Sequence, residues 1–164
     1  MKHALVLFSS PHKDGHTKKL LEAFLDGLKG DDWQVKSLDI CKENIHPCIA
    51  CGYCQKADGC AFRDLDEFDR DLRACDLLVI ATPVYNLSFP AQLKAVIDRF
   101  YANNEALMGK KKVVFLTAMA DEDQKTASGA NASFDLMADY LGWEIVGRLN
   151  VGGSSTADDL HEED

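Results

Sequence analysis

The chain has no long hydrophobic run and a deficit of positive charge, and both absences exclude classes of function. No apolar stretch approaches the ~20 residues that a membrane-crossing helix needs. The start, Met1-Lys2-His3-Ala4, lacks a basic flank, an apolar core and a small-residue cleavage site, so we expect a cytoplasmic location and no membrane partner. Lysine and arginine number 18 against 27 aspartates and glutamates, and the net charge of -9 opposes binding to nucleic acid.

Two common nucleotide-binding motifs are also missing. The sequence contains neither the G-x-G-x-x-G fingerprint of dinucleotide-binding domains nor the G-K-S/T of phosphate-binding P-loops. These absences argue against a Rossmann dehydrogenase and against an NTPase. No repeat, low-complexity tract or linker divides the chain, so we expect a single domain over residues 1–164 that ends in an acidic tail at 157–164.

Strand patterns alternate with helical stripes along the chain. Apolar runs predict five strands, and apolar positions spaced by three and four residues predict the helices between them. The predicted strands are 4–8, 33–38, 77–80, 112–116 and 143–151, and the predicted helices are 16–29 (ended by Gly30), about 64–73, one opened by Pro90 and one ended by Gly142. This alternation indicates an α/β fold in which right-handed crossovers join parallel strands and helices cover both faces of the sheet.

Polar segments follow three of these strands, at 9–17, 82–86 and 117–121. In a doubly wound sheet the ligand lies beyond the carboxyl ends of the strands, so we expect these segments to form one site. The first segment is rich in hydroxyls and opens a helix, whose free N–H groups are suited to a phosphate. Helix capping by Asp14 or Thr17 would explain that segment equally well on its own.

Two motifs carry a family resemblance. Ser9-Ser10-Pro11-x-x-x-Gly15-x-Thr17 resembles the phosphate loop of the NADPH-dependent FMN reductase group, within the flavodoxin-like superfamily. Ala81-Thr82-Pro83-Val84-Tyr85-Asn86, followed by Leu93-Lys94-x-x-x-Asp98-Arg99, resembles the second flavin loop and next helix of that group. The resemblance implies FMN and a flavodoxin-like, doubly wound five-stranded parallel sheet of order 2-1-3-4-5. With two residues from the third polar segment, the expected FMN-binding residues are Ser9, Ser10, Pro11, His16, Thr17, Lys18, Pro83, Val84, Tyr85, Asn86, Thr117 and Ala118.

Four of the six cysteines lie between residues 48 and 60, in the pattern Cys48-x2-Cys51-x2-Cys54-x5-Cys60. Such spacing lets one short loop wrap around an iron-sulfur cluster. The pattern resembles that of the iron-sulfur flavoproteins, a branch of the same group that carries one [4Fe-4S] cluster beside FMN. The resemblance implies that Cys48, Cys51, Cys54 and Cys60 are the cluster ligands. It also implies a homodimer or homotetramer and a ferredoxin-like electron donor.

Other uses of the cysteines stay open. Structural zinc usually takes cysteine pairs from separated segments, so four ligands in one short run suit it poorly. Cys51 and Cys54 could instead form a redox-active dithiol, because thiols of this spacing can have lowered pKa values. Cys41 and Cys75 stand apart from the run, and we expect both to be small buried hydrophobic residues.

The sequence thus predicts an FMN-dependent oxidoreductase that takes electrons from NAD(P)H or a ferredoxin-like donor and passes them to a small-molecule or protein acceptor. The flavin would supply the chemistry, so no catalytic side chain is named. The alternative is a non-enzymatic FMN electron carrier or a thiol redox sensor, for which an acidic protein is equally suitable.

Overall fold

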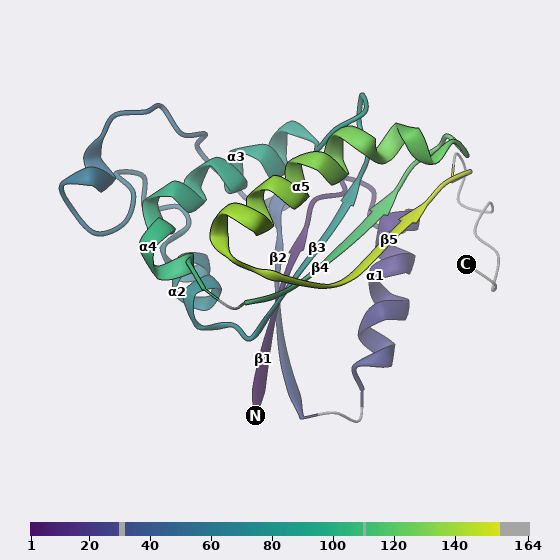
Figure 1. The fold of residues 1–164 in the computed structure, drawn as a ribbon, viewed down its shortest axis with the longest axis horizontal. Coiled ribbons are helices and arrows are strands. Elements are labelled where there is room, and N and C mark those ends of the chain that lie inside the picture. Colours follow the sequence, from purple (N-terminus) through teal and green to yellow (C-terminus); the bar gives the residue numbers. More distant parts are fainter. Residues whose placement is uncertain (30–31, 110, 155–164) are drawn as a thin grey trace.

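Five parallel strands form one sheet in the order β2-β1-β3-β4-β5, as predicted. The structure is a computed structural model that describes residues 1–29, 32–109 and 111–154. The helices, strands and short 3-10 turns are β1 (Lys2–Phe8), α1 (His16–Gly27), β2 (Trp33–Asp39), η1 (Ile40–Lys42), η2 (Tyr53–Gln55), α2 (Asp66–Ala74), β3 (Leu77–Pro83), α3 (Ala91–Arg99), η3 (Phe100–Asn103), α4 (Asn104–Leu107), β4 (Lys112–Ala118), η4 (Gln124–Ala127), α5 (Ser128–Leu141) and β5 (Glu144–Val151) (Figure 1).

The three central strands are buried on both faces, which explains their continuous apolar runs. Val6 of β1 pairs with Val79 of β3, and Val79 pairs with Val114 of β4. All three side chains are almost completely buried. The carboxyl ends of these strands lie at one edge of the sheet, where the polar segments follow.

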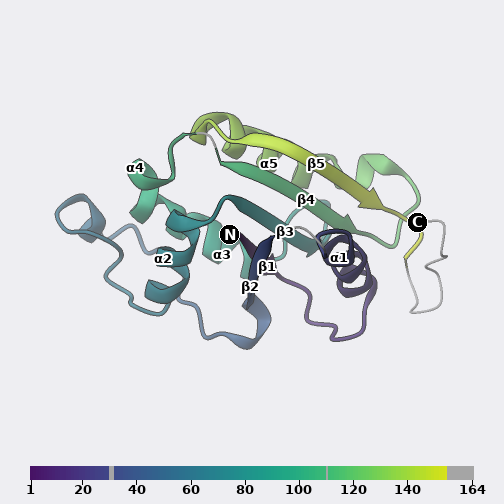
Figure 2. The same cartoon turned by 90° about the horizontal axis from the view of Figure 1, so that it is seen from below.

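Helices cover the two faces unequally. Helices α2, α3 and α5 pack on one face, where Phe134 of α5 stacks on Phe115 of β4 with ring centroids 4.4 Å apart. On the other face Leu20 and Leu21 of α1 pack over the central strands, and α1 is the only helix among the described residues that does so (Figure 2). The expected helices on both faces are therefore present, with a single one on the α1 side.

The side chains of the two edge strands, β2 and β5, are more exposed than those of the three central strands. Val35 on β2 is 39% exposed, and Leu149 on β5, which pairs with Leu116, is 42% exposed. Periodicity in the sequence indicates strands here but does not report how well each face is covered.

Element boundaries follow local chemistry. Gly142 adopts a left-handed conformation with φ of 69° and ends α5, as predicted. The prediction that the first helix reaches residue 29 is wrong, because α1 ends at Gly27. The predicted stop at Gly30 and the acidic tail at 157–164 lie outside the described residues. No helix in the described ranges is long and apolar enough to cross a membrane.

The cysteine-rich segment connects β2 to α2. Between residues 43 and 65 it contains only the short η2 turn, and it extends beyond the sheet on the side away from α1 (Figures 1 and 2). Ala50, Gly52 and Gly59 all have positive φ angles, so the backbone reverses direction repeatedly within this loop.

Candidate functional site

The three polar segments meet around one cavity of about 590 Å³ at the carboxyl edge of the sheet, which we call the carboxyl-edge cavity. It lies between the loop after β1, the loop after β3 and the loop after β4, as expected for a doubly wound sheet. Its lining residues are Ser10, His12, Lys13, Asp14, Gly15, His16, Thr17, Pro83, Val84, Tyr85, Ala118, Met119, Ala120 and Ser154.

Seven of the twelve expected FMN-binding residues line this cavity: Ser10, His16, Thr17, Pro83, Val84, Tyr85 and Ala118. Ser9, Pro11, Lys18, Asn86 and Thr117 are not among its lining residues. The Lys18 ammonium forms an ion pair with Glu22, 3.3 Å away, one turn along α1.

Ser9 and Thr117 are fully buried beneath the cavity, with their hydroxyls already bonded to other side chains. The Ser9 hydroxyl donates to Thr82 Oγ1 at 2.7 Å, which ties the end of β1 to the end of β3. Thr117 donates to Asn150 Oδ1 at 2.7 Å and ties β4 to β5. These hydroxyls therefore hold the strand ends in register under the cavity.

Helix α1 opens directly into the carboxyl-edge cavity. Gly15 is its N-cap residue, and the Lys18 and Lys19 N–H groups donate to Gly15 O at 2.9 and 3.2 Å. No side chain of the described structure caps this helix, so capping by Asp14 or Thr17 does not explain the segment. The positive end of the helix dipole therefore lies at this cavity. Thr17, in the first turn of the helix, is almost fully buried and also lines the cavity.

The loop after β3 forms a tight turn that packs against α5. Tyr85 and Ser88 exchange two backbone hydrogen bonds of 3.0 and 3.1 Å across it. Asn86 and Leu87 between them have φ angles of 48° and 66°, so both are left-handed. A Cβ atom on Gly129 of α5 would lie 2.3 Å from Leu87 O, so only glycine lets this turn pack so closely against α5.

We expect Leu87→Gly to stabilise the protein by about 0.5–1 kcal/mol, because leucine is strained in the left-handed region and glycine is not. The side chain is 60% exposed, so its loss removes little buried apolar surface. The free energy of unfolding in urea measures the effect. Asn86→Gly is the matched control and should change stability by less, since asparagine tolerates this conformation. Destabilisation by Leu87→Gly would mean that the side chain makes a needed contact.

Tyr85 presents a half-exposed ring to the cavity, and its phenol keeps its proton at neutral pH. Burial raises the pKa of this phenol above its usual value, and the nearby Cys41 thiol adds to the shift.

Cys41 is only partly buried, and its thiol donates to Ser9 O at 3.4 Å. The expectation of a buried cysteine is therefore confirmed for Cys75 and wrong for Cys41, which lies beside the site.

Seven lining residues are not among the twelve expected ones: His12, Lys13, Asp14, Gly15, Met119, Ala120 and Ser154. The first four belong to the polar segment after β1. Met119 and Ala120 belong to the polar segment after β4, so the sequence had located them by position. Ser154 reaches the cavity because its N–H donates to Met119 O at 3.0 Å. No local pattern in the sequence indicates that contact.

All four clustered cysteines line a second cavity, of about 480 Å³, which we call the cysteine cavity. It is built from the cysteine-rich loop and the end of α3 and shares no lining residue with the carboxyl-edge cavity. Cys60 is buried, Cys54 partly buried, and Cys48 and Cys51 are exposed. The Ala50 N–H donates to Cys48 Sγ at 3.4 Å, a type of contact that also tunes iron-sulfur clusters.

The spacing of the four cysteines suits a cluster better than a structural zinc ion. Among the described residues, no group of three or more His, Cys, Asp or Glu is arranged to hold one metal ion. Structural zinc usually takes its ligands as pairs from separated segments, whereas these four cysteines lie in one short run. All four cysteines line one cavity, and thiolate sulfur is the donor that iron-sulfur clusters use. His46 lies flat on Phe62 with ring centroids 4.6 Å apart and is not one of the lining residues.

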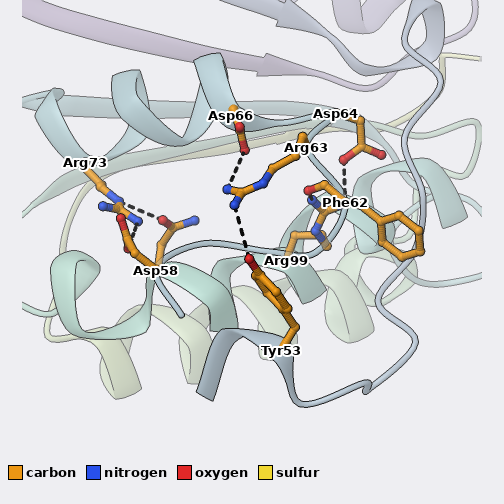
Figure 3. A network of polar contacts seen from close by, with 9 residues as sticks. Tyr53, Asp58, Phe62, Arg63, Asp64, Asp66, Arg73 and Arg99 are labelled. Atoms are coloured by element: carbon orange, nitrogen blue, oxygen red, sulfur yellow. Dashed lines mark hydrogen bonds and ion pairs between the residues drawn. The ribbon is translucent and has the colours of Figure 1, made fainter. Parts of the chain in front are cut away.

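Three arginines fasten the cysteine-rich loop to α2 and α3 (Figure 3). Arg63 contacts Tyr53 Oη at 3.5 Å and Asp66 at 3.7 Å. Arg73 contacts Asp58 Oδ1 at 3.0 Å. Arg99 is bonded to the two flanks of the cysteine run and is the most deeply buried of the three.

The fold and the carboxyl-edge cavity define an α/β protein of the flavodoxin-like class. The family model for NADPH-dependent FMN reductase matches residues 3–157, and the chain belongs to this family. The resemblance drawn from the two motifs is thus confirmed.

Relatives with curated descriptions include iron-sulfur flavoproteins. One from Archaeoglobus fulgidus is 36% identical over 110 residues, which cover 65% of this chain and 50% of the relative. Another from Methanosarcina thermophila is 38% identical over 91 residues, covering 55% of this chain and 48% of the relative. The chain therefore spans about half the length of these relatives.

Solved structures share the fold at lower identity. The NAD(P)H:quinone oxidoreductase from Methanothermobacter marburgensis superposes with a TM-score of 0.77 at 20% identity, over 96% of this chain and 86% of the other. An azoreductase from Bacillus anthracis gives a TM-score of 0.69 at 18% identity, over 93% and 88% of the two chains. At these identities the likeness shows the fold alone.

Proposed function

We propose that the chain binds FMN in the carboxyl-edge cavity and transfers electrons from NAD(P)H or a ferredoxin-like donor to a small-molecule or protein acceptor. The observation that carries the proposal is the meeting of three polar loops around one cavity at the N-terminus of α1. Membership of the NADPH-dependent FMN reductase family supports the choice of FMN. A homodimer or homotetramer and a cytoplasmic location are part of the same proposal.

Each loop has a distinct role in holding the cofactor. The first-turn amides of α1 and the Thr17 hydroxyl would bind the terminal phosphate, because helix N-termini favour anions. The loop from Pro83 to Tyr85 would lie along the flavin ring, with the tyrosine offering an apolar face and a protonated phenol. FMN supplies the electron chemistry when it is bound, while the protein orients it and limits its access to water.

The second part of the proposal is that Cys48, Cys51, Cys54 and Cys60 bind one [4Fe-4S] cluster in the cysteine cavity. The presence of all four cysteines in the lining of one cavity supports it, and two relatives of the chain are described as iron-sulfur flavoproteins. The two cavities share no lining residue, so the flavin and the cluster would occupy separate sites.

Anaerobic purification tests the proposal directly. Flavin released from the protein should co-elute with FMN, and recovery of FAD or of no flavin would contradict the assignment. Steady-state oxidation of NAD(P)H with a quinone as acceptor then separates the enzyme from an electron carrier. A carrier would be reduced by a protein donor and would show negligible turnover with nicotinamide.

We expect Thr17→Val to weaken FMN binding by about 1 kcal/mol, or roughly fivefold in Kd, because one neutral hydrogen bond is lost while the side-chain shape is kept. Thr126→Val is the matched control. The Thr126 hydroxyl donates to Asp121 Oδ2 at 2.7 Å, and this residue does not line the cavity, so its loss should leave Kd unchanged. Fluorescence titration of the apoprotein measures both. Equal Kd values for wild type and Thr17→Val would remove Thr17 from the site.

A further inference from the structure

Arg99 is an almost completely buried arginine at the end of α3, with only 2% of its surface exposed. Its guanidinium donates to His46 O at 3.0 Å and to Phe62 O at 2.7 Å. These carbonyls lie two residues before Cys48 and two residues after Cys60 in the sequence. One side chain therefore hydrogen-bonds to the backbone on both sides of the cysteine run.

Arg99 lines the cysteine cavity, whereas its counter-ion does not. Arg99 is a lining residue together with the four cysteines, and Asp64, which contacts the guanidinium at 2.8 Å, is not. The Asp64 carboxylate is held by the backbone N–H and Nδ1 of His46 at 2.7 and 2.9 Å. Figure 3 shows Arg99 between Phe62 and Asp64. The positively charged residue of the ion pair is therefore the one that lines the cavity.

One donor of Arg99 has no partner in the described structure. The Nε atom is buried without a hydrogen bond, although every other contact of this guanidinium is made to protein. A buried N–H without a partner calls for an explanation, and an anionic or sulfur-bearing group in the cavity that Arg99 lines would supply an acceptor.

We propose that Arg99 is a positioning residue that sets the reduction potential of the group bound by the four cysteines. The inference rests on the proposed [4Fe-4S] cluster. Four thiolates give such a cluster a net negative charge, and reduction adds one more. A buried positive charge beside it stabilises the reduced form and raises the potential, because little water screens the interaction.

Arg63 and Arg73, the other two arginines that contact the cysteine-rich loop, do not line the cysteine cavity. The Arg63 side chain is more than half exposed and pairs with Asp66 at the surface. Solvent and salt screen its charge there, so its effect on the reduction potential is small. Arg73 donates to Asn103 Oδ1 at 2.7 Å and to Asp58, and it does not line the cysteine cavity. Arg73 therefore fastens the same loop without facing the cluster site, which makes it the structural control.

The test uses two variants that break the same ion pair from opposite sides. Arg99→Met removes the positive charge and should make cluster reduction at least tenfold less favourable, which is about 59 mV for a one-electron couple. Asp64→Asn removes the negative charge and should shift the potential the other way. Loss of loop structure alone would move both variants in the same direction. Arg73→Met should leave the potential unchanged, and Arg99→Lys, which keeps the charge, should restore most of it.

Anaerobic titration with dithionite, followed by electron paramagnetic resonance, measures the potentials after iron and sulfide have been quantified. No iron uptake by the wild type would refute the proposed cluster itself. Iron uptake by the wild type with equal potentials in Arg99→Met and Asp64→Asn would overturn only the role of Arg99. If Arg99→Met does not retain a cluster, the absence of an upward shift in Asp64→Asn overturns it equally.

Discussion

Replacing Cys60 by serine is expected to remove most of the iron that the protein can take up. The wild type should bind about four iron and four sulfide per chain, which is the stoichiometry of a [4Fe-4S] cluster. Cys60 is the most buried of the four clustered cysteines, at 8% exposure, and it lines the cysteine cavity with the other three. Its loss leaves three thiols, two of them open to solvent.

The same substitution separates the cluster from a dithiol switch. A redox pair formed by Cys51 and Cys54 needs no contribution from Cys60, so the variant would keep its thiol chemistry unchanged. Cys41→Ser is the matched control, because Cys41 lies outside the cysteine cavity and should leave iron uptake as in the wild type.

Iron and acid-labile sulfide must be measured on protein reconstituted without oxygen, since an exposed cluster is readily destroyed by air. If the wild type takes up no more iron than Cys60→Ser, the cysteines have another use and the chain is a plain flavin protein. Zinc in an as-purified, colourless protein would point instead to a structural metal, which the spacing of the four cysteines disfavours.

The five strands and the location of the site could be predicted from local patterns, whereas the strand order came from the family resemblance. Apolar runs such as 77–80 mark buried strands, and the rules for parallel sheets then place the polar segments at one edge. Seven of the expected residues do line the cavity, among them Thr17 and Tyr85. Ser9 and Thr117 do not, because both are fully buried and their hydroxyls are bonded to Thr82 and Asn150.

The features that escaped prediction depend on contacts between distant residues. Arg99 belongs to a motif that the sequence displays, but its partners His46 and Phe62 lie 53 and 37 residues away, so its hydrogen bonds on both sides of the cysteine run are visible only in the fold. The uneven coverage of the two sheet faces likewise depends on where α1 packs, which periodicity does not encode.

Gly129 illustrates how a remote residue shapes the site. It lies in the first turn of α5, and nothing in its local sequence marks it as special. A Cβ at this position would meet Leu87 O at 2.3 Å, and that atom is backbone, which cannot rotate away as a side chain could. The Tyr85–Ser88 turn, which carries one of the cavity residues, therefore depends on a glycine 42 positions after Leu87.

Gly129→Ala is accordingly expected to destabilise the protein by about 2–3 kcal/mol, the usual cost of overpacking a close contact, even though alanine favours helices. Displacement of the turn should also move Tyr85 and weaken FMN binding about tenfold, or roughly 1.4 kcal/mol. Urea unfolding measures the first effect, and flavin titration of the apoprotein measures the second.

Gly27→Ala provides the matched control, because a Cβ there would meet no atom within 4 Å. The same change of residue in the last turn of α1 should leave stability equal or raise it by up to about 1 kcal/mol, with FMN affinity unchanged. Wild-type flavin affinity in Gly129→Ala, together with lowered stability, would show that the turn can shift without disturbing the cofactor. The loop after β3 would then contribute to the site through Pro83 and Val84 rather than through the turn that Gly129 supports, since both of these residues line the cavity ahead of the turn.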